Sequence, residues 1–243
     1  MNQCNGKISK IETFGTVDGP GIRTVLFFNN CLLRCKFCHN PEMWQEKNCN
    51  FSSEEIVKKI LRNKPYFKNN GGITISGGEP LLQYRFLIDI CKKLKKENIH
   101  IALDTSGIGL GHYKEILEYI DLVLLDIKHV NKNGFKNITQ KDKYDEFIKF
   151  ISFLNKSNKE VWVRQVIIPD VNDNDKYINE LAKFIKKIKN VKKIEFLPFH
   201  TIGFTKYKQL NIDNPYINKK AKDEKECKKL YNKFQKIYKK GMK

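Results

Sequence analysis

The apolar run LVLLDI at residues 122–127 decides the fold class of this chain. Five of its six residues are apolar, so it lacks the alternation of a strand that has one face in water. Similar runs lie on both sides of it: IRTVLFF (22–28), GITIS (72–76), HIALD (100–104), EVWVRQVII (160–168) and KIEFLPF (193–199). Because strands that are covered on both faces are typical of parallel sheets, the sequence predicts six buried parallel strands.

Segments of helical period separate these strands. We predict helices at residues 52–63, 81–97, 112–120, 143–157 and 175–190. The first opens with Ser52 or Ser53 followed by Glu55, which is the pattern of a capping box. Six strand–helix units are too few for a standard eight-stranded barrel. We therefore expect an α/β fold, a partial (β/α)6 TIM-like barrel with parallel strands.

No linker rich in Gly, Ser or Pro divides the sequence, so we expect one domain over residues 1–243. Its core is expected at about residues 10–208. A basic helix is expected at about residues 219–240, packed through Leu230, Phe234 and Ile237.

Composition excludes some classes of protein. The chain has 243 residues, of which 40% are hydrophobic, and this argues against general disorder. The N-terminus lacks the apolar region of a secretory signal, and no apolar run approaches the roughly 20 residues of a membrane span. We therefore expect a cytoplasmic protein.

The net charge of +19 invites a nucleic-acid function, but only five of the 46 basic residues are arginines. Specific phosphate and base recognition favours arginine, and the lysines are spread over predicted helix surfaces. We therefore regard nucleic acid as a disfavoured partner, although an enzyme that acts on RNA stays an alternative.

Polar residues gather where the predicted strands end. The first three strands are followed by CLLRCKFCHN (31–40), SGGEP (76–80) and DTSG (104–107). The last three carry Asp126 and Lys128, Arg164, and His200. The carboxyl ends of parallel strands form one rim, which holds the chemistry in such folds, so we expect these residues to share a site.

Three of the seven cysteines, Cys31, Cys35 and Cys38, fall within eight residues. With His39 they could bind zinc in a binding module, although adjacent ligands at 38 and 39 would strain the backbone. Alternatively, three cysteines could hold an iron–sulfur cube and leave one iron open to a small molecule. The remaining cysteines match no motif, and Cys91 is expected in a helix core: Cys4, Cys49, Cys91 and Cys227.

The spacing CxxxCxΦC, with Phe37 as the aromatic residue, followed by SGGEP after the next strand, resembles the radical S-adenosylmethionine (SAM) superfamily. Within it, the glycyl-radical-enzyme activases are similar in TFGTVDGPGIRTVLFF (13–28), CHNPEMW (38–44), LDTSG (103–107), LLDIKH (124–129), VWVRQVIIP (161–169) and IEFLPFH (194–200). The resemblance covers about residues 10–208. It implies a [4Fe–4S] cluster held by Cys31, Cys35 and Cys38, with S-adenosylmethionine on the fourth iron.

In this family one electron cleaves the S–C5′ bond of S-adenosylmethionine, and the resulting 5′-deoxyadenosyl radical takes a hydrogen from a glycine Cα of a partner enzyme. The resemblance implies pyruvate formate-lyase as that partner, because no further cysteine set lies between the cluster loop and SGGEP. Activases of other glycyl radical enzymes, such as anaerobic ribonucleotide reductase, stay alternatives. The family also implies flavodoxin or ferredoxin as electron donor, and we expect a monomer.

The resemblance assigns individual roles as well. Catalysis is expected from the three cysteines together with Lys128 and Arg164. Cofactor contacts are expected from the cluster loop and from four strand ends: Phe37, Cys38, His39, Asn40, Gly77, Gly78, Glu79, Asp126, Ile127, Lys128, Arg164, Val166 and His200. In particular, Phe37 would lie against the adenine, Glu79 would accept a bond from the cofactor ammonium and Lys128 would face its carboxylate.

Two further expectations concern other ligands. A monovalent cation could bind at Asp104, Thr105 and Asp126. Asp18, in the turn sequence DGPG, resembles a residue that lies near the peptide of the protein substrate.

Overall fold

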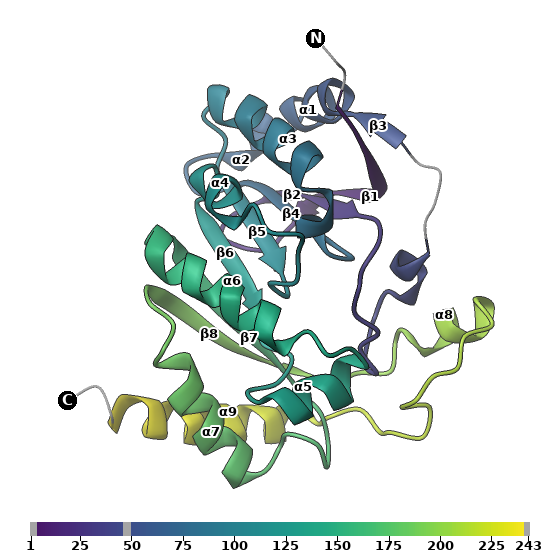
Figure 1. Ribbon diagram of the computed structural model, residues 1–243, viewed down its shortest axis with the longest axis vertical. Helices are drawn as coiled ribbons and strands as arrows, with labels where there is room; N and C mark the ends of the chain where they lie inside the picture. Colours follow the sequence, from purple (N-terminus) through teal and green to yellow (C-terminus); the bar gives the residue numbers. More distant parts are fainter. Residues whose placement is uncertain (1–3, 46–49, 241–243) are drawn as a thin grey trace.

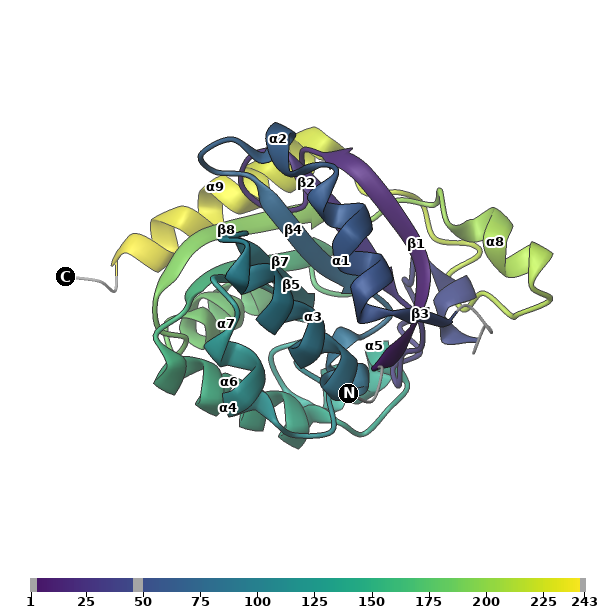
Figure 2. The same cartoon turned by 90° about the horizontal axis from the view of Figure 1, so that it is seen from above.

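The computed structural model describes residues 4–45 and 50–240, which form one curved sheet wrapped by helices (Figure 1). The strand order is β3-β1-β2-β4-β5-β6-β7-β8, and the view from above shows the strands curving with helices outside them (Figure 2). The sheet is not closed, because the order ends at β3 on one side and at β8 on the other. The expected open, partial barrel is therefore confirmed.

The six predicted strands are present and parallel: β2 (Arg23–Phe28), β4 (Gly72–Gly77), β5 (Ile101–Thr105), β6 (Leu122–Asp126), β7 (Glu160–Ile167) and β8 (Val191–Pro198). The sequence gives no sign of the two others, β1 (Asn5–Gly15) and β3 (Asn50–Ser52), which pair antiparallel at the β2 edge. Ile8 is the deeply buried residue of β1, and β3 has three residues, so neither contains an apolar run.

Five helices occupy the predicted segments, mostly with shorter bounds: α1 (Ser53–Leu61), α3 (Tyr84–Lys96), α4 (Tyr113–Glu118), α6 (Tyr144–Ser157) and α7 (Asp175–Ile185). A 3-10 turn, η2 (Pro80–Gln83), precedes α3 because Pro80 opens it. The C-terminal helix α9 (Glu224–Lys240) buries Phe234, with Leu230 and Ile237 partly buried against the same core, as expected.

Four short elements were not predicted: η1 (Pro41–Trp44), α2 (Lys64–Phe67), α5 (Lys132–Thr139) and α8 (Phe204–Gln209). Of these, α5 matters most for the site. Its sequence KNGFKNIT contains a glycine and two asparagines, which disfavour helix interiors. The side chain of Asn131 caps it by accepting from the Gly134 N–H at 2.9 Å, and Phe135 and Ile138 anchor it. None of the helices within the described ranges is long and apolar enough to cross a membrane.

The two faces of the sheet differ in character. On the outer face, Ile73, Ile75 and Leu103 pack against the helices in the main core. On the inner face a smaller cluster contains Ala102, Leu122, Leu124 and Trp162. Alternation along each strand places the next inner residues of β5 and β6 at Asp104 and Asp126. The inside of the barrel therefore turns from apolar to charged toward the carboxyl ends of the strands.

We predict that Ser52→Ala lowers the free energy of unfolding by about 1 kcal/mol, because α1 then loses its cap. The Ser52 Oγ accepts from the Glu55 N–H at 3.2 Å, and the Glu55 carboxylate accepts from the Ser52 N–H at 2.8 Å. Urea unfolding of Ser52→Ala measures this loss. Ser52→Thr, which keeps the hydroxyl, is the matched control, and an equal loss in both variants would contradict capping as the cause.

Candidate functional site

A cavity of about 410 Å³ lies at the carboxyl ends of the parallel strands. This volume is within the range of small-molecule sites. Fourteen of the eighteen residues singled out from the sequence line it: Cys31, Cys35, Phe37, Cys38, His39, Asn40, Gly77, Gly78, Asp104, Thr105, Asp126, Lys128, Val166 and His200. The fold therefore brings together side chains that are up to 169 positions apart in the sequence.

The other four lie around the cavity rather than on its wall. Ile127 is buried in the outer core, and its N–H donates to the Arg164 carbonyl at 2.9 Å. Arg164 and Glu79 lie beneath the wall. Asp18 lies in the turn between β1 and β2, at the amino ends of the strands, where its carbonyl accepts from the Thr74 hydroxyl at 2.5 Å.

The cysteine loop is held from outside by α5. The Arg34 N–H donates to the Thr139 carbonyl and the Lys36 N–H to the Ile138 carbonyl, both at 2.9 Å. The Arg34 guanidinium folds back on the loop, donating to the Cys31 carbonyl at 2.6 Å while lying over the Trp44 ring. Since both sides of the loop are fastened, the three thiols face the cavity from a fixed frame.

The three thiols are free and affect one another electrostatically. Burial raises the pKa of each, that of Cys35 to about 12, so without a metal they stay protonated. Among the described residues, no three Cys, His, Asp or Glu side chains converge closely enough for one metal ion. A cube requires a different arrangement, because each cysteine binds its own iron. The donor set of three buried thiols on one loop therefore fits a cluster, whose binding would displace their protons.

Four buried charges of alternating sign connect β5, β6 and β7. The Arg164 guanidinium donates to Asp104 with one nitrogen and to Asp126 Oδ1 at 3.1 Å with another. Lys128 Nζ donates to Asp126 Oδ2 at 3.0 Å. Burial alone would raise the pKa of Asp126, but Lys128 and Arg164 outweigh it and hold this pKa below its usual range. The two carboxylates singled out for a cation are thus bridged by Arg164.

Lys128 also connects this network to the cysteine loop. Its Nζ lies 5.4 Å from the centroid of the Phe37 ring, within the range of a cation–π contact. Burial opposes its charge, but the Asp126 carboxylate outweighs this and raises the pKa of Lys128. Lys128 is therefore a permanent cation on the cavity wall.

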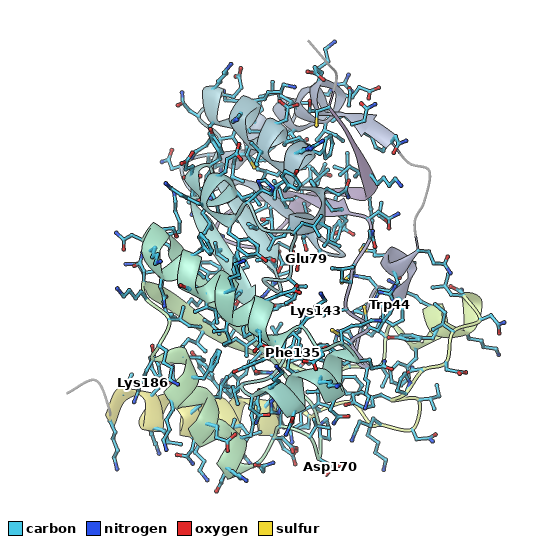
Figure 3. All side chains as sticks on the ribbon, in the orientation of Figure 1. Trp44, Glu79, Phe135, Lys143, Asp170 and Lys186 are labelled. Carbon is cyan, nitrogen blue, oxygen red and sulfur yellow. The ribbon has the colours of Figure 1, made fainter. Side chains whose placement is uncertain are left out.

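Glu79 is only 1% exposed and has protein partners for both carboxylate oxygens. Its Oε1 accepts from the Thr105 hydroxyl at 2.5 Å and from the Leu81 N–H at 3.3 Å. Its Oε2 accepts from the Ser106 N–H and hydroxyl at 2.9 and 2.6 Å. The carboxylate expected to face an ammonium group thus fastens the end of β5 to the turn after β4 (Glu79 is labelled in Figure 3).

The two glycines before Glu79 are required by the neighbouring strand. A Cβ on Gly77 would lie 2.3 Å from the Phe28 carbonyl oxygen, and one on Gly78 would lie 2.1 Å from that of Asn30. Gly77 also has a φ of +115°, which other residues rarely adopt. The close approach that the structure shows at both glycines is to the backbone at the end of β2. The expected close approach of their backbone to a ligand stays a prediction.

On the far side of the cavity, α8 holds the residues that follow Cys38. The Tyr207 hydroxyl donates to the Cys38 carbonyl at 3.0 Å, and Lys206 donates to Asn40 Oδ1 at 2.7 Å. His39 Nδ1 and His200 Nε2 lie 3.1 Å apart, so one of these nitrogens donates and the other accepts. The sequence contained no signal for Tyr207, because α8 has no motif and no regular period.

Known proteins resemble this chain in sequence and in fold. Residues 25–185 match the model of the radical SAM superfamily. The pyruvate formate-lyase-activating enzyme of Clostridium pasteurianum is 50% identical over 93% of this chain and 95% of its own. That of Staphylococcus epidermidis is 39% identical over 93% and 94%. A radical SAM methyltransferase from Sphaerobacter thermophilus has the same fold, with a TM-score of 0.64 and 16% identity over 96% of this chain and 74% of its own.

We predict a pH-dependent difference in stability between the protein and its Glu79→Gln variant. Burial raises the pKa of Glu79 from its usual 4.5 to about 7. Between these values the folded state keeps a proton that the unfolded chain has lost, so this group contributes less stability as the pH rises. The stability of the protein relative to Glu79→Gln should fall by up to roughly 1.4 kcal/mol per pH unit across this window.

Urea unfolding of both proteins at several pH values between 4.5 and 7 measures this difference. Glu118→Gln, at an exposed position of α4, is the matched control, because it removes a carboxylate from the surface instead of from the buried site. A difference between the protein and Glu79→Gln that stays constant over this range would contradict the raised pKa.

Proposed function

This chain belongs to the radical SAM superfamily and, within it, to the pyruvate formate-lyase-activating enzymes, and we propose that its reaction takes place in the cavity at the strand ends. The observation that carries the proposal is the set of three free cysteines on one fastened loop, facing the buried charges of β5, β6 and β7. A bound cluster would supply the electron for the reductive cleavage of S-adenosylmethionine, the chemistry by which the glycine Cα hydrogen of pyruvate formate-lyase would be removed.

In this proposal Cys31, Cys35 and Cys38 hold the [4Fe–4S] cluster. α5 and Arg34 keep their loop in place before the cluster binds, so little ordering is needed at that moment. The cavity wall would then hold S-adenosylmethionine beside the cluster. Phe37 and His200 offer aromatic surfaces to the adenosyl group, and Lys128 offers its cation to the carboxylate.

The charge network gives Lys128 a fixed position. A lysine side chain is flexible in water, but here Asp126 and the Phe37 ring hold it from two directions. Arg164 fixes Asp126 in turn. Donors that are oriented before the ligand arrives need no reorganisation during the reaction. We therefore assign Lys128 to cofactor binding and Arg164 to positioning it through Asp126. A monovalent cation at Asp104, Thr105 and Asp126 forms no part of the proposal, because Arg164 already lies between the carboxylates.

We assign Asp18 to the side from which the glycine segment arrives. Burial raises the pKa of Asp18, and the Asp104 carboxylate adds to this effect, so the two acids lie within electrostatic range inside the barrel. Arg23 fixes the turn, donating to the Thr74 hydroxyl at 2.7 Å and to the Pro20 carbonyl at 3.1 Å. A peptide that enters from this end would meet Asp18 before it reaches the cofactor.

The partners follow from the same assignment. The enzyme acts as a monomer in the reducing cytoplasm on pyruvate formate-lyase, and flavodoxin or ferredoxin provides the electron. Anaerobic ribonucleotide reductase is the alternative substrate. The chain between the cluster loop and β4 bears on the choice of substrate enzyme. Its described part contains η1, β3, α1 and α2, and Cys49 lies outside the described residues.

The deciding experiment mixes the anaerobically reconstituted enzyme with S-adenosylmethionine, a reductant and pure pyruvate formate-lyase. The expected result is the EPR doublet of a glycyl radical. Anaerobic ribonucleotide reductase replaces the lyase in a parallel sample. A doublet in that sample alone would transfer the activity to the alternative substrate, and no doublet in either sample would contradict the proposal.

We predict that Cys35→Ala abolishes the cluster and the cleavage of S-adenosylmethionine. Two cysteines cannot hold the cube in the described geometry, whereas the loop keeps its backbone bonds to α5. Iron and acid-labile sulfide should fall from about four of each per chain to nearly none. Cys227→Ala, at a buried position on α9, is the matched control and should keep both. Reductive cleavage by Cys35→Ala would contradict the ligand assignment.

We predict that Lys128→Met weakens S-adenosylmethionine binding by roughly tenfold or more, the size of a lost hydrogen bond to a charged group. The iron content should stay unchanged, because Lys128 is not a ligand. Equilibrium binding to the reconstituted enzyme measures the dissociation constant. Lys132→Met, at an exposed position on α5, is the control. Equal affinity in all three proteins would remove Lys128 from the cofactor site.

A further inference from the structure

The outer side of the cysteine loop forms a cationic surface together with the C-terminal half of α5. We propose that this surface, which consists of Lys36, Lys136, Asn137, Gln140 and Lys141 and is called here the α5 surface, docks an acidic protein that carries one electron. This inference rests on the proposed function, because it names the route by which the cluster would be reduced.

The α5 surface lies directly behind the cysteine loop. Lys36 lies between Cys35 and Phe37, and its Nζ donates to Asn137 Oδ1 of α5 at 2.7 Å. Gln140 Nε2 donates to the Arg34 carbonyl at 2.8 Å. Together with the two backbone bonds to Ile138 and Thr139, these contacts place α5 directly behind the loop. A protein bound there is separated from the ligating cysteines by a single layer of chain.

The outer side of the cysteine loop stays accessible to a large protein during the proposed reaction. The thiols and the charge network face the cavity, which S-adenosylmethionine and the glycine segment occupy in the proposed reaction. In the proposed reaction S-adenosylmethionine fills the cavity and the substrate enzyme covers the amino ends of the strands, so a large electron carrier can use neither approach. The outer side of the loop is the opposite approach to the same cysteines, and it leaves the cavity free.

The charge of the α5 surface suits an acidic partner. Lys136 and Lys141 are exposed, and Lys36 is half-buried with its amino group at an exposed contact. The acidic side chain that faces them is Asp142, whose Oδ2 lies 3.4 Å from Lys136 Nζ in a solvated pair. Such a pair is weak, and with three lysines against one carboxylate the surface keeps a net positive charge. Electrostatic complementarity mainly raises association rates, which suits a carrier that must bind and leave.

A one-electron donor such as flavodoxin hydroquinone would supply the electron that the cluster gains. The flavin loses one electron and one proton to become the neutral semiquinone, and the proton goes to solvent. The cluster gains the electron, and no bond forms between the two proteins. Flavodoxin is therefore the probe of choice for the test.

The test reverses two charges that touch neither the cavity nor the cysteines, in the double variant Lys136→Glu/Lys141→Glu. The reconstituted enzyme is reduced either by flavodoxin hydroquinone or by photoreduced 5-deazariboflavin, a small neutral reductant. Formation of 5′-deoxyadenosine gives the rate. With flavodoxin at low ionic strength we expect a decrease of roughly tenfold or more, because steering is lost. With the small reductant the rate should be unchanged, which also shows that the variant is folded.

The matched control is Lys229→Glu/Lys236→Glu on α9, which lowers the net charge of the chain by the same amount. Both positions are exposed, and α9 packs against α7 and β8, whereas α5 packs against α6. This control should keep the flavodoxin rate within twofold. Titration of the holoenzyme with flavodoxin, followed by flavin fluorescence, should show weaker binding for the α5 variant alone.

Three outcomes would overturn the inference. An unchanged flavodoxin rate in the α5 variant would show that the carrier docks elsewhere. An equal decrease of the flavodoxin rate in the α9 control would show that the effect comes from the net charge of the chain and not from the α5 surface. A loss with pyruvate formate-lyase as the titrated protein, and none with flavodoxin, would assign the surface to the substrate enzyme. If the unmodified enzyme forms no 5′-deoxyadenosine with either reductant, the proposed function fails, and the docking surface fails with it.

Discussion

The site depends on one buried interaction, the guanidinium of Arg164 between the carboxylates of Asp104 and Asp126. Each partner comes from a different strand, so the contact ties together the ends of β5, β6 and β7. Burying these charges is expensive, and it is tolerated because each charge has a neighbour of opposite sign. Lys128 adds a further positive charge next to Asp126. It also contacts the cysteine loop, because its ammonium group lies over the Phe37 ring. The positions of the cofactor-binding side chains are therefore set by a network that exists before any cofactor binds.

Most arginines of this chain hold internal structure, whereas most of its lysines lie at the surface. Three of the five arginines hold loops or strand ends: Arg23, Arg34 and Arg164. Each makes several bonds at once, which a planar guanidinium does well and an ammonium does poorly. Lysines dominate the surface pairs, where the geometry is less demanding. Most of the net charge of +19 therefore lies on lysines at the surface, whereas Lys128 and Lys206 contact residues of the cavity.

The sequence predicted the six parallel strands and the open barrel because buried strands leave a local signal that needs no knowledge of partners. It predicted most of the cavity wall for a related reason, since parallel strands place their carboxyl ends on one rim. It missed β1 and α5, whose stability comes from tertiary pairing rather than from their own pattern. It could not show the partners that Glu79 and the glycines at 77 and 78 have within the protein, because no spacing reveals Ser106, Thr105 and the end of β2, and the ligand contacts expected of these residues stay predictions.

These elements separate three approaches to one centre. The turn that carries Asp18 lies at the amino ends of the strands, the cavity lies at their carboxyl ends, and α5 covers the loop from outside. An enzyme that must accept an electron, bind a cofactor and receive a peptide gains from such a separation, since one partner need not leave before the next arrives. The short, poorly helical α5 is then explained by its position. Its carbonyls at Ile138 and Thr139 accept from the loop because a helix leaves its last carbonyls unpaired, so this part of the site needs only the end of a helix.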